Sequence, residues 1–164
     1  MKKRWDVLVL LFIVRVSMAF QFQSVAAMSP AVMKAYGVTV ADIGVLISLY
    51  LAPGVAFAIP GGEIGRRFGD KRVVLSGLVL MIVGGLLMAF AQTWSLQIAG
   101  RIVAGIGGVL LNVLMSKMVT DWFAGKEIAT AMAIFVNSWP VGIALCLFLV
   151  PALQPREAYQ SRSF

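Results

Sequence analysis

Five long apolar blocks, separated by short polar links, are the feature that most constrains how this chain can fold. The blocks cover residues 6–27, 42–65, 73–91, 96–119 and 128–150. Each is close to the ~20 residues that an α-helix needs to cross a hydrocarbon core ~30 Å thick. Apolar and polar residues do not alternate within the blocks, which argues against the strands of a membrane barrel. The sequence therefore predicts an all-α membrane protein with five transmembrane helices.

The links between the blocks are short, as in KAYGVT, QTWS and TDWFAGKE. Short links join neighbouring antiparallel helices, so we expect one compact membrane helix bundle over residues 1–150. Residues 151–164 are polar, and we expect them to form a disordered or aberrant tail instead of a sixth span.

Basic residues dominate the charge of the chain, and the formal net charge is +7 at pH 7. They cluster at the amino-terminal end and in the link after the second block instead of forming one face, which argues against binding to nucleic acid. Lysine and arginine in membrane proteins gather on the cytoplasmic side. We therefore expect a multi-pass protein of the cell inner membrane, with the lipid bilayer as its partner and a cytoplasmic amino terminus.

The chain has no histidine and one cysteine, Cys146, which lies inside the fifth block. Zinc sites built on histidine and histidine-based catalytic triads are therefore excluded. We expect no catalytic residue, no metal and no cofactor, and Cys146 is interpreted as a small buried apolar residue.

Two arginines, Arg15 and Arg101, lie inside apolar blocks. A charged residue deep in a span costs roughly 2.5–3.5 kcal/mol on insertion scales, and it normally faces the bundle interior or a wet cavity. One interpretation is a role in substrate or proton coupling, with Arg101 as the first candidate and Arg15 as the second; the other is packing against backbone carbonyls. Asn137 and Gln21 are further polar residues that we expect to face inward. Because no acidic residue lies deep in the blocks, the cavity should favour an anionic solute.

Prolines and glycines inside the blocks predict bends and close contacts between helices. Proline removes a backbone donor and kinks a helix. Pro53-Gly54, and Pro140 with Gly142, are therefore candidate hinges of a transport cycle, with a static kink as the alternative. Gly105 belongs to a run of small residues, and such residues let helix backbones approach closely in lipid.

A weak internal repeat relates the first three blocks to the last two. Three pairs of similar residues are 86, 85 and 87 residues apart: Arg15 and Arg101, Asp42 and Glu127, Pro53 and Pro140. Two successive units of three helices have opposite orientations in a membrane, which is the inverted repeat of many secondary transporters. Coincidence is the alternative explanation.

Two segments carry a resemblance to a known family. Residues 61–72, GGEIGRRFGDKR, resemble the loop between the second and third spans of the major facilitator superfamily, Gly-x-x-x-Asp-Arg-x-Gly-Arg-Arg/Lys. The matching residues of this loop are Gly62, Arg67, Gly69 and Lys71. Residues 101–108, RIVAGIGG, are similar to the Arg-x-x-x-Gly-x-Gly motif of that family, with Arg101 and Gly105 in place. The first two blocks look most like the cyanate and nitroimidazole branch.

The loop departs from the family pattern at two positions. Arg66 stands where the family has Asp, and Asp70 stands where it has Arg. In the family this acidic residue helps to lock the two halves of the protein on the cytoplasmic side, so Glu63 or Asp70 would have to serve in this gate loop. The fifth block has Trp139-Pro140 instead of the Gly-Pro of the family's antiporter motif, so an antiporter is not implied.

The resemblance implies a secondary active transporter that moves a small solute by alternating access, with a proton as a candidate partner. It covers the chain up to about residue 151, whereas family members have twelve spans in two six-helix halves. We therefore interpret the chain as a fragment: a partial six-helix amino-terminal half, whose missing carboxy-terminal half is a candidate partner. The alternative is a non-transporting membrane subunit or interaction protein.

Overall fold

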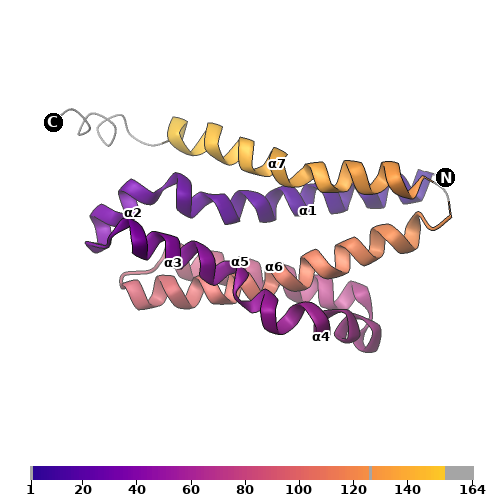
Figure 1. Cartoon of the computed structure of the whole chain (residues 1–164), viewed down its shortest axis with the longest axis horizontal. Helices are drawn as coiled ribbons and strands as arrows, with labels where there is room; N and C mark the ends of the chain where they lie inside the picture. The colour runs from indigo at the N-terminus through magenta and orange to yellow at the C-terminus, as the bar shows by residue number, and fades with distance from the viewer. Residues whose placement is uncertain (1, 126, 154–164) are drawn as a thin grey trace.

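The computed structural model describes residues 2–125 and 127–153 as helices joined by short turns (Figure 1). The helices are α1 (Lys2–Ala27), α2 (Ser29–Tyr36), α3 (Val40–Leu51), α4 (Pro53–Phe68), α5 (Asp70–Ala89), α6 (Trp94–Trp122) and α7 (Ile128–Leu153). Within these residues there is no strand, and five segments are long and apolar enough to cross a membrane: Lys3–Ala27, Val40–Phe57, Asp70–Ala89, Trp94–Trp122 and Ile128–Leu153. The prediction of an all-α membrane protein with five transmembrane helices is therefore confirmed.

The second span is built from two helices, whereas the sequence predicts one apolar block over residues 42–65. α4 begins at Pro53, because proline has no N–H with which to continue the hydrogen bonds of α3. Ala52 between the two helices keeps helical dihedral angles, φ −53° and ψ −41°, and its N–H donates to the Ser48 carbonyl. The chain therefore breaks at the predicted Pro53-Gly54 position but continues in the same general direction (Figure 1).

A short helix that the sequence does not predict, α2, occupies the link between the first two spans. Pro30 lies in its first turn, where a missing N–H is tolerated. Gly37 ends the helix with φ +65°, in the left-handed region that glycine enters at little cost. Tyr36 donates its hydroxyl to the Ala91 carbonyl at 2.6 Å, which ties α2 to the turn between α5 and α6.

The last helix, α7, extends further than the fifth apolar block. It runs through Pro151 to Leu153, so it enters the segment that is expected to be a tail. The rest of that segment, residues 154–164, lies outside the described residues. Pro140 lies inside α7, which is assigned as one continuous helix, and Cys146 on the same helix is fully buried.

Two closely packed helix pairs organise the bundle: α5 lies against α6, and α1 lies against α7 (Figure 1). Small residues allow these approaches. A Cβ on Gly84 of α5 would lie 2.5 Å from the Ala104 nitrogen of α6, and a Cβ on Gly142 of α7 would lie 2.5 Å from the Val16 carbonyl oxygen of α1. Gly105 of α6 is equally close to the backbone of α3. Glycine is therefore required at these three crossings.

The links lie at two ends of the bundle (Figure 1). One end holds the start of α1, the turn between α4 and α5, and the link between α6 and α7. We call it the basic end because it carries most of the described Lys and Arg side chains: Lys3, Arg4, Arg66, Arg67, Lys71, Arg72 and Lys117. The opposite end holds α2, with Lys34, and the turn between α5 and α6.

Candidate functional site

Arg101 lies inside α6, and its side chain is fully buried. Its Nε donates to the Leu46 carbonyl at 3.2 Å, and its two terminal nitrogens donate to the carbonyls of Gln21 at 3.3 Å and Phe22 at 2.9 Å. The guanidinium carbon also lies 4.6 Å from the centroid of the Tyr50 ring, within the range of a cation–π contact. Arg101 therefore joins α6 to α1 and α3, which is the packing role that the sequence leaves open as an alternative.

Arg15 of α1 has a different environment. Its side chain is only partly buried, and its guanidinium carbon lies 4.2 Å from the centroid of the Phe135 ring and 6.0 Å from that of Trp139 on α7. Its Nε is buried and has no hydrogen-bond partner in the structure. A guanidinium carries five N–H donors, so Arg15 keeps donors with which it could bind a ligand.

Aromatic side chains connect the two arginines. Phe22 meets Tyr50 at a centroid distance of 5.4 Å and Trp139 at 5.6 Å. We call Phe22, Tyr50, Phe135 and Trp139 the aromatic layer; it draws on α1, α3 and α7. Arg15 of the first span lies over Phe135 of the fifth, and Arg101 of the fourth span lies over Tyr50 of the second. The predicted repeat relates the first span to the fourth and the second to the fifth, so the two contacts are equivalent under it. Sequence reasoning missed this layer, although Phe135 and Trp139 are four residues apart and so share a helix face.

Two other predicted polar residues lie apart from this layer. Asn137 is exposed, and its Nδ2 donates to the Ala133 carbonyl of its own helix at 2.8 Å. Gln21 accepts from Arg101 through its backbone carbonyl, but its side chain points elsewhere: Nε2 donates to the Met81 carbonyl of α5 at 3.0 Å. The structure thus brings Arg15 and Arg101 to one layer and leaves the side chains of Asn137 and Gln21 outside it.

Charged residues at the basic end form ion pairs within the chain. Lys117 of α6 places its Nζ 2.9 Å from both carboxylate oxygens of Asp70 on α5. Glu63 and Arg66 pair at 2.9 Å on α4, where their side chains are 51% and 76% exposed. Asp70, one of the two acidic residues expected to serve in the gate loop, is therefore held by α6 of the same chain.

The remaining residues of the predicted gate loop lie on the surface. Arg67 and Lys71 are exposed, and Gly62 has open space where a Cβ would stand. Gly69 turns the chain between α4 and α5 with φ +86°. Most side chains are strained in that region of φ, so this glycine is required by the turn itself.

Sequence reasoning missed a further contact at the basic end. Arg4 pairs with Glu127 at 2.9 Å, and its guanidinium carbon lies 5.7 Å from the centroid of the Phe123 ring. Trp5 meets the same ring edge-on at 5.3 Å. These contacts fasten the start of α1 to the link between α6 and α7.

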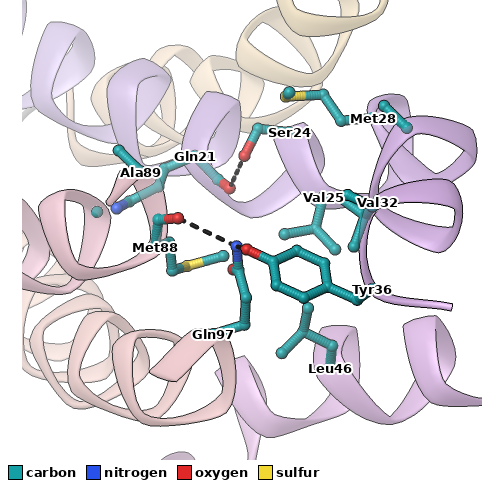
Figure 2. Close-up of a pocket in the computed structure, with 13 residues that line it drawn as sticks. Gln21, Ser24, Val25, Met28, Val32, Tyr36, Leu46, Met88, Ala89 and Gln97 are labelled. Carbon is teal, nitrogen blue, oxygen red and sulfur yellow. Dashed lines mark hydrogen bonds between the residues drawn. The ribbon is translucent and has the colours of Figure 1, made fainter. Parts of the chain in front are cut away.

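A pocket of about 560 Å³ lies among α1, α2, α3, α5 and α6, and Figure 2 shows residues that line it. Because α2 forms part of its wall, the pocket lies near the end of the bundle opposite the basic end (Figure 1). Gln97 of α6 is nearly buried and donates through Nε2 to the Met88 carbonyl at 3.0 Å and to the Tyr36 hydroxyl at 3.1 Å. Ser24 donates to the Gln21 carbonyl at 2.7 Å. The pocket therefore combines an apolar wall with a small polar network.

Comparisons with known proteins agree with this architecture. The family model described as Major Facilitator Superfamily matches residues 11–154. The choline/ethanolamine transporter FLVCR2 of Rattus norvegicus is 25% identical, over 98% of this chain and 30% of its own length. The D-galactonate transporter of Escherichia coli is 28% identical, over 93% of this chain and 35% of its own.

A third relative is the probable 4-methylmuconolactone transporter of Cupriavidus pinatubonensis, 23% identical over 87% of this chain and 34% of its own length. The chain therefore spans between 30 and 35% of the length of these curated relatives. The resemblance to the cyanate and nitroimidazole branch is not tested by these relatives and stays a prediction.

Proposed function

The chain belongs to the major facilitator superfamily, and from that premise we propose that it forms part of a secondary transporter that carries a small anionic solute by alternating access. It is a multi-pass membrane protein. The relatives are named as transporters of choline or ethanolamine, of D-galactonate and of 4-methylmuconolactone. These names point to different solutes, so the charges of this chain are the basis for the class of solute that we propose.

The observation that carries the proposal is the environment of Arg15. This cation lies inside a span, is only partly buried, and has a buried Nε without a partner. The acidic residues of the described helices lie toward helix ends instead: Asp6, Asp42, Glu63, Asp70 and Asp121. A carboxylate or phosphate matches the fork of guanidinium donors well, so an anionic solute fits this place better than a cation.

Arg101 then has a supporting role in the proposal. The sequence makes it the first candidate for coupling, but three of its donors are already bound to backbone carbonyls. We assign it as a positioning residue that holds α1 and α3 on α6, and with them the aromatic layer beneath Arg15.

The proposed orientation places the basic end in the cytoplasm of a cell with an inner membrane. Most of the described Lys and Arg residues lie at that end, which is what the positive-inside rule expects. At this end Asp70 is engaged by Lys117, whereas Arg67 is exposed. We propose that the gate loop presents its arginines, and not an acid, to the remaining helices of the transporter, which form the missing carboxy-terminal half.

Binding of organic anions to the purified chain in lipid nanodiscs tests the site. Arg15→Gln should weaken anion binding by about tenfold or more, because one charge-assisted hydrogen bond is worth about 1.5–3 kcal/mol. Arg67→Gln is the matched control, since that arginine is exposed at the basic end, and it should bind as the parent does. Equal anion binding by the parent and Arg15→Gln would show that Arg15 is not the anion site.

Counterflow of the bound anion into proteoliposomes tests the transport step separately. We expect counterflow that Arg15→Gln abolishes when the chain is reconstituted with its remaining helices. Binding without counterflow in that complete assembly would favour the alternative of a non-transporting membrane subunit.

A further inference from the structure

We infer that the site at Arg15 selects aromatic carboxylates, because Trp139 offers a flat surface on which the ring of the ligand stacks. The inference rests on the proposed anion site at Arg15 and adds the class of solute to it. The carboxylate binds the terminal nitrogens of Arg15, and the ring lies on the indole of Trp139. Trp139 is therefore a residue that determines specificity.

The guanidinium of Arg15 has one face covered and its terminal donors open. Its carbon lies 4.2 Å from the centroid of the Phe135 ring, which is fully buried. Nε is buried, but Nη1 and Nη2 make no hydrogen bond to any described residue and are not among the buried atoms without a partner. These two nitrogens therefore keep accessible surface. A guanidinium binds a carboxylate through two parallel N–H groups in one plane, so the ligand reaches Arg15 through Nη1 and Nη2.

Trp139 lies beside these donors, with its ring centroid 6.0 Å from the guanidinium carbon of Arg15. It follows Phe135 by four residues on α7, so the two rings are neighbours on one helix face, about 6 Å apart along the axis. A carboxylate conjugated to an aromatic ring is coplanar with that ring. A flat ligand therefore continues the plane of the guanidinium, and its ring lies over Trp139 as Arg15 lies over Phe135.

The indole of Trp139 is accessible and is also held in place. The residue is only partly buried. Its Nε1 has no hydrogen bond to a described residue and is not among the buried atoms without a partner. Phe22 packs against it with ring centroids 5.6 Å apart. Aromatic rings 4.5–7 Å apart stabilise each other beyond the area that they bury, so an aromatic ligand gains more here than a saturated ring of the same size.

Arg101 does not compete with Arg15 for the carboxylate. Its side chain is fully buried, and its three nitrogens donate to backbone carbonyls. Its guanidinium carbon lies 5.6 Å from the centroid of the Phe22 ring. Arg101 therefore supports the ring that packs against Trp139 and leaves the anion to Arg15.

Benzoate and cyclohexanecarboxylate form the matched pair of ligands that tests this inference. Both are ionised at pH 7 and carry one carboxylate on a six-membered ring, but only benzoate is aromatic. Binding of each radiolabelled compound to the full chain is measured in lipid nanodiscs, and binding to empty nanodiscs is subtracted because both compounds partition into lipid. We expect benzoate to bind about two- to tenfold more tightly, the worth of one aromatic pair, and Arg15→Gln to weaken both compounds.

Variants of two tryptophans assign the preference to one ring. Trp139→Leu should make the affinities for benzoate and cyclohexanecarboxylate equal, because it removes the aromatic surface and keeps an apolar side chain. Trp139→Phe should keep a preference for benzoate. Trp122→Leu is the matched control, since Trp122 is 47% exposed at the end of α6, and it should keep the full preference.

Fluorescence of Trp139 gives a second readout that does not depend on the folding of Trp139→Leu. The chain has four tryptophans, so changing Trp5, Trp94 and Trp122 to phenylalanine leaves Trp139 as the reporter. Bromine quenches tryptophan fluorescence at contact. We expect 4-bromobenzoate to quench Trp139 saturably and excess benzoate to restore the emission; quenching that does not saturate would contradict contact between the ring and Trp139.

The results separate this inference from the proposed anion site. Equal binding of benzoate and cyclohexanecarboxylate, with both weakened by Arg15→Gln, would overturn the aromatic selectivity and leave the anion site standing. A preference for benzoate that survives Trp139→Leu would also overturn it, because the ring would then bind elsewhere. Binding of neither compound, or binding that Arg15→Gln does not change, would remove the anion site and the inference with it.

Discussion

Gly84→Ala tests whether the close pairing of α5 with α6 holds this bundle together. An alanine Cβ at this position would lie 2.5 Å from the Ala104 nitrogen, 2.6 Å from the Gly100 carbonyl oxygen and 2.8 Å from the Ala104 Cα. Favourable contacts between such atoms need ~3.5–4.0 Å. All three atoms belong to the backbone, so no change of rotamer can relieve the clash, and the two helices must separate by about 1 Å.

The size of the effect follows from a comparison with a glycine that has space. Overpacking of this kind costs typically 1–3 kcal/mol. Gly44→Ala is the control, because nothing lies within 4 Å of a Cβ there. Both variants share the gain of up to ~1 kcal/mol that alanine has over glycine in a helix. The difference in unfolding free energy between them, about 1–3 kcal/mol, therefore measures the clash alone.

The chain carries its own reporter for this experiment. Cys146 is its one cysteine and is fully buried, so a thiol-reactive fluorophore labels it only when the bundle opens. We expect labelling of Gly84→Ala to begin at a lower temperature than that of Gly44→Ala, by about 2–4 °C for each kcal/mol. Gly85→Ala should lie between them, since its Cβ meets only the flexible end of Gln21. Equal labelling temperatures for Gly84→Ala and Gly44→Ala would refute the reasoning.

Two further predictions use the same labelling assay. Arg101→Lys should lower the unfolding free energy by about 2 kcal/mol or more, because an ammonium group cannot reach three carbonyls on two helices as the planar guanidinium does; a parent-like labelling temperature would contradict this. A double-mutant cycle of Asp70→Asn and Lys117→Met should give a coupling of about 1 kcal/mol, and the cycle of Glu63→Gln and Arg66→Met should give a coupling near zero because that pair is exposed. Equal couplings in the two cycles would remove the distinction between these ion pairs.

The candidate site could be predicted from the sequence only in part. A charge inside an apolar block is visible in the sequence, so Arg15 and Arg101 could be singled out. Their relative roles could not, because the role depends on what lies opposite each guanidinium: three carbonyls for Arg101, and a ring with free donors for Arg15. The exchange of acid and base in the gate loop was visible as well, but Lys117, the partner of Asp70, was not, since it lies 47 residues along the chain.

The pocket could not be predicted from the sequence either. Gln21 was expected to face inward with Asn137, but only the packing of α5 against α1 shows that the Gln21 amide binds Met81 and leaves one oxygen without a partner. α2 forms a wall of this pocket. The sequence did not predict this helix, because its eight residues are too few and too polar to form a transmembrane span.

By itself the sequence determined that this chain crosses a membrane five times as helices. The free energy of transfer of a segment into lipid and the hydrogen bonding of the backbone within a helix both depend on residues close together in the chain. It also determined where basic residues gather. The tertiary structure alone decided which donors remain free, which carbonyls receive Arg101, and where a pocket forms. These outcomes depend on contacts between spans. Such contacts form where helices pack closely, at residues such as Gly84, Gly105 and Gly142, and the local sequence around a glycine does not show which helix packs against it.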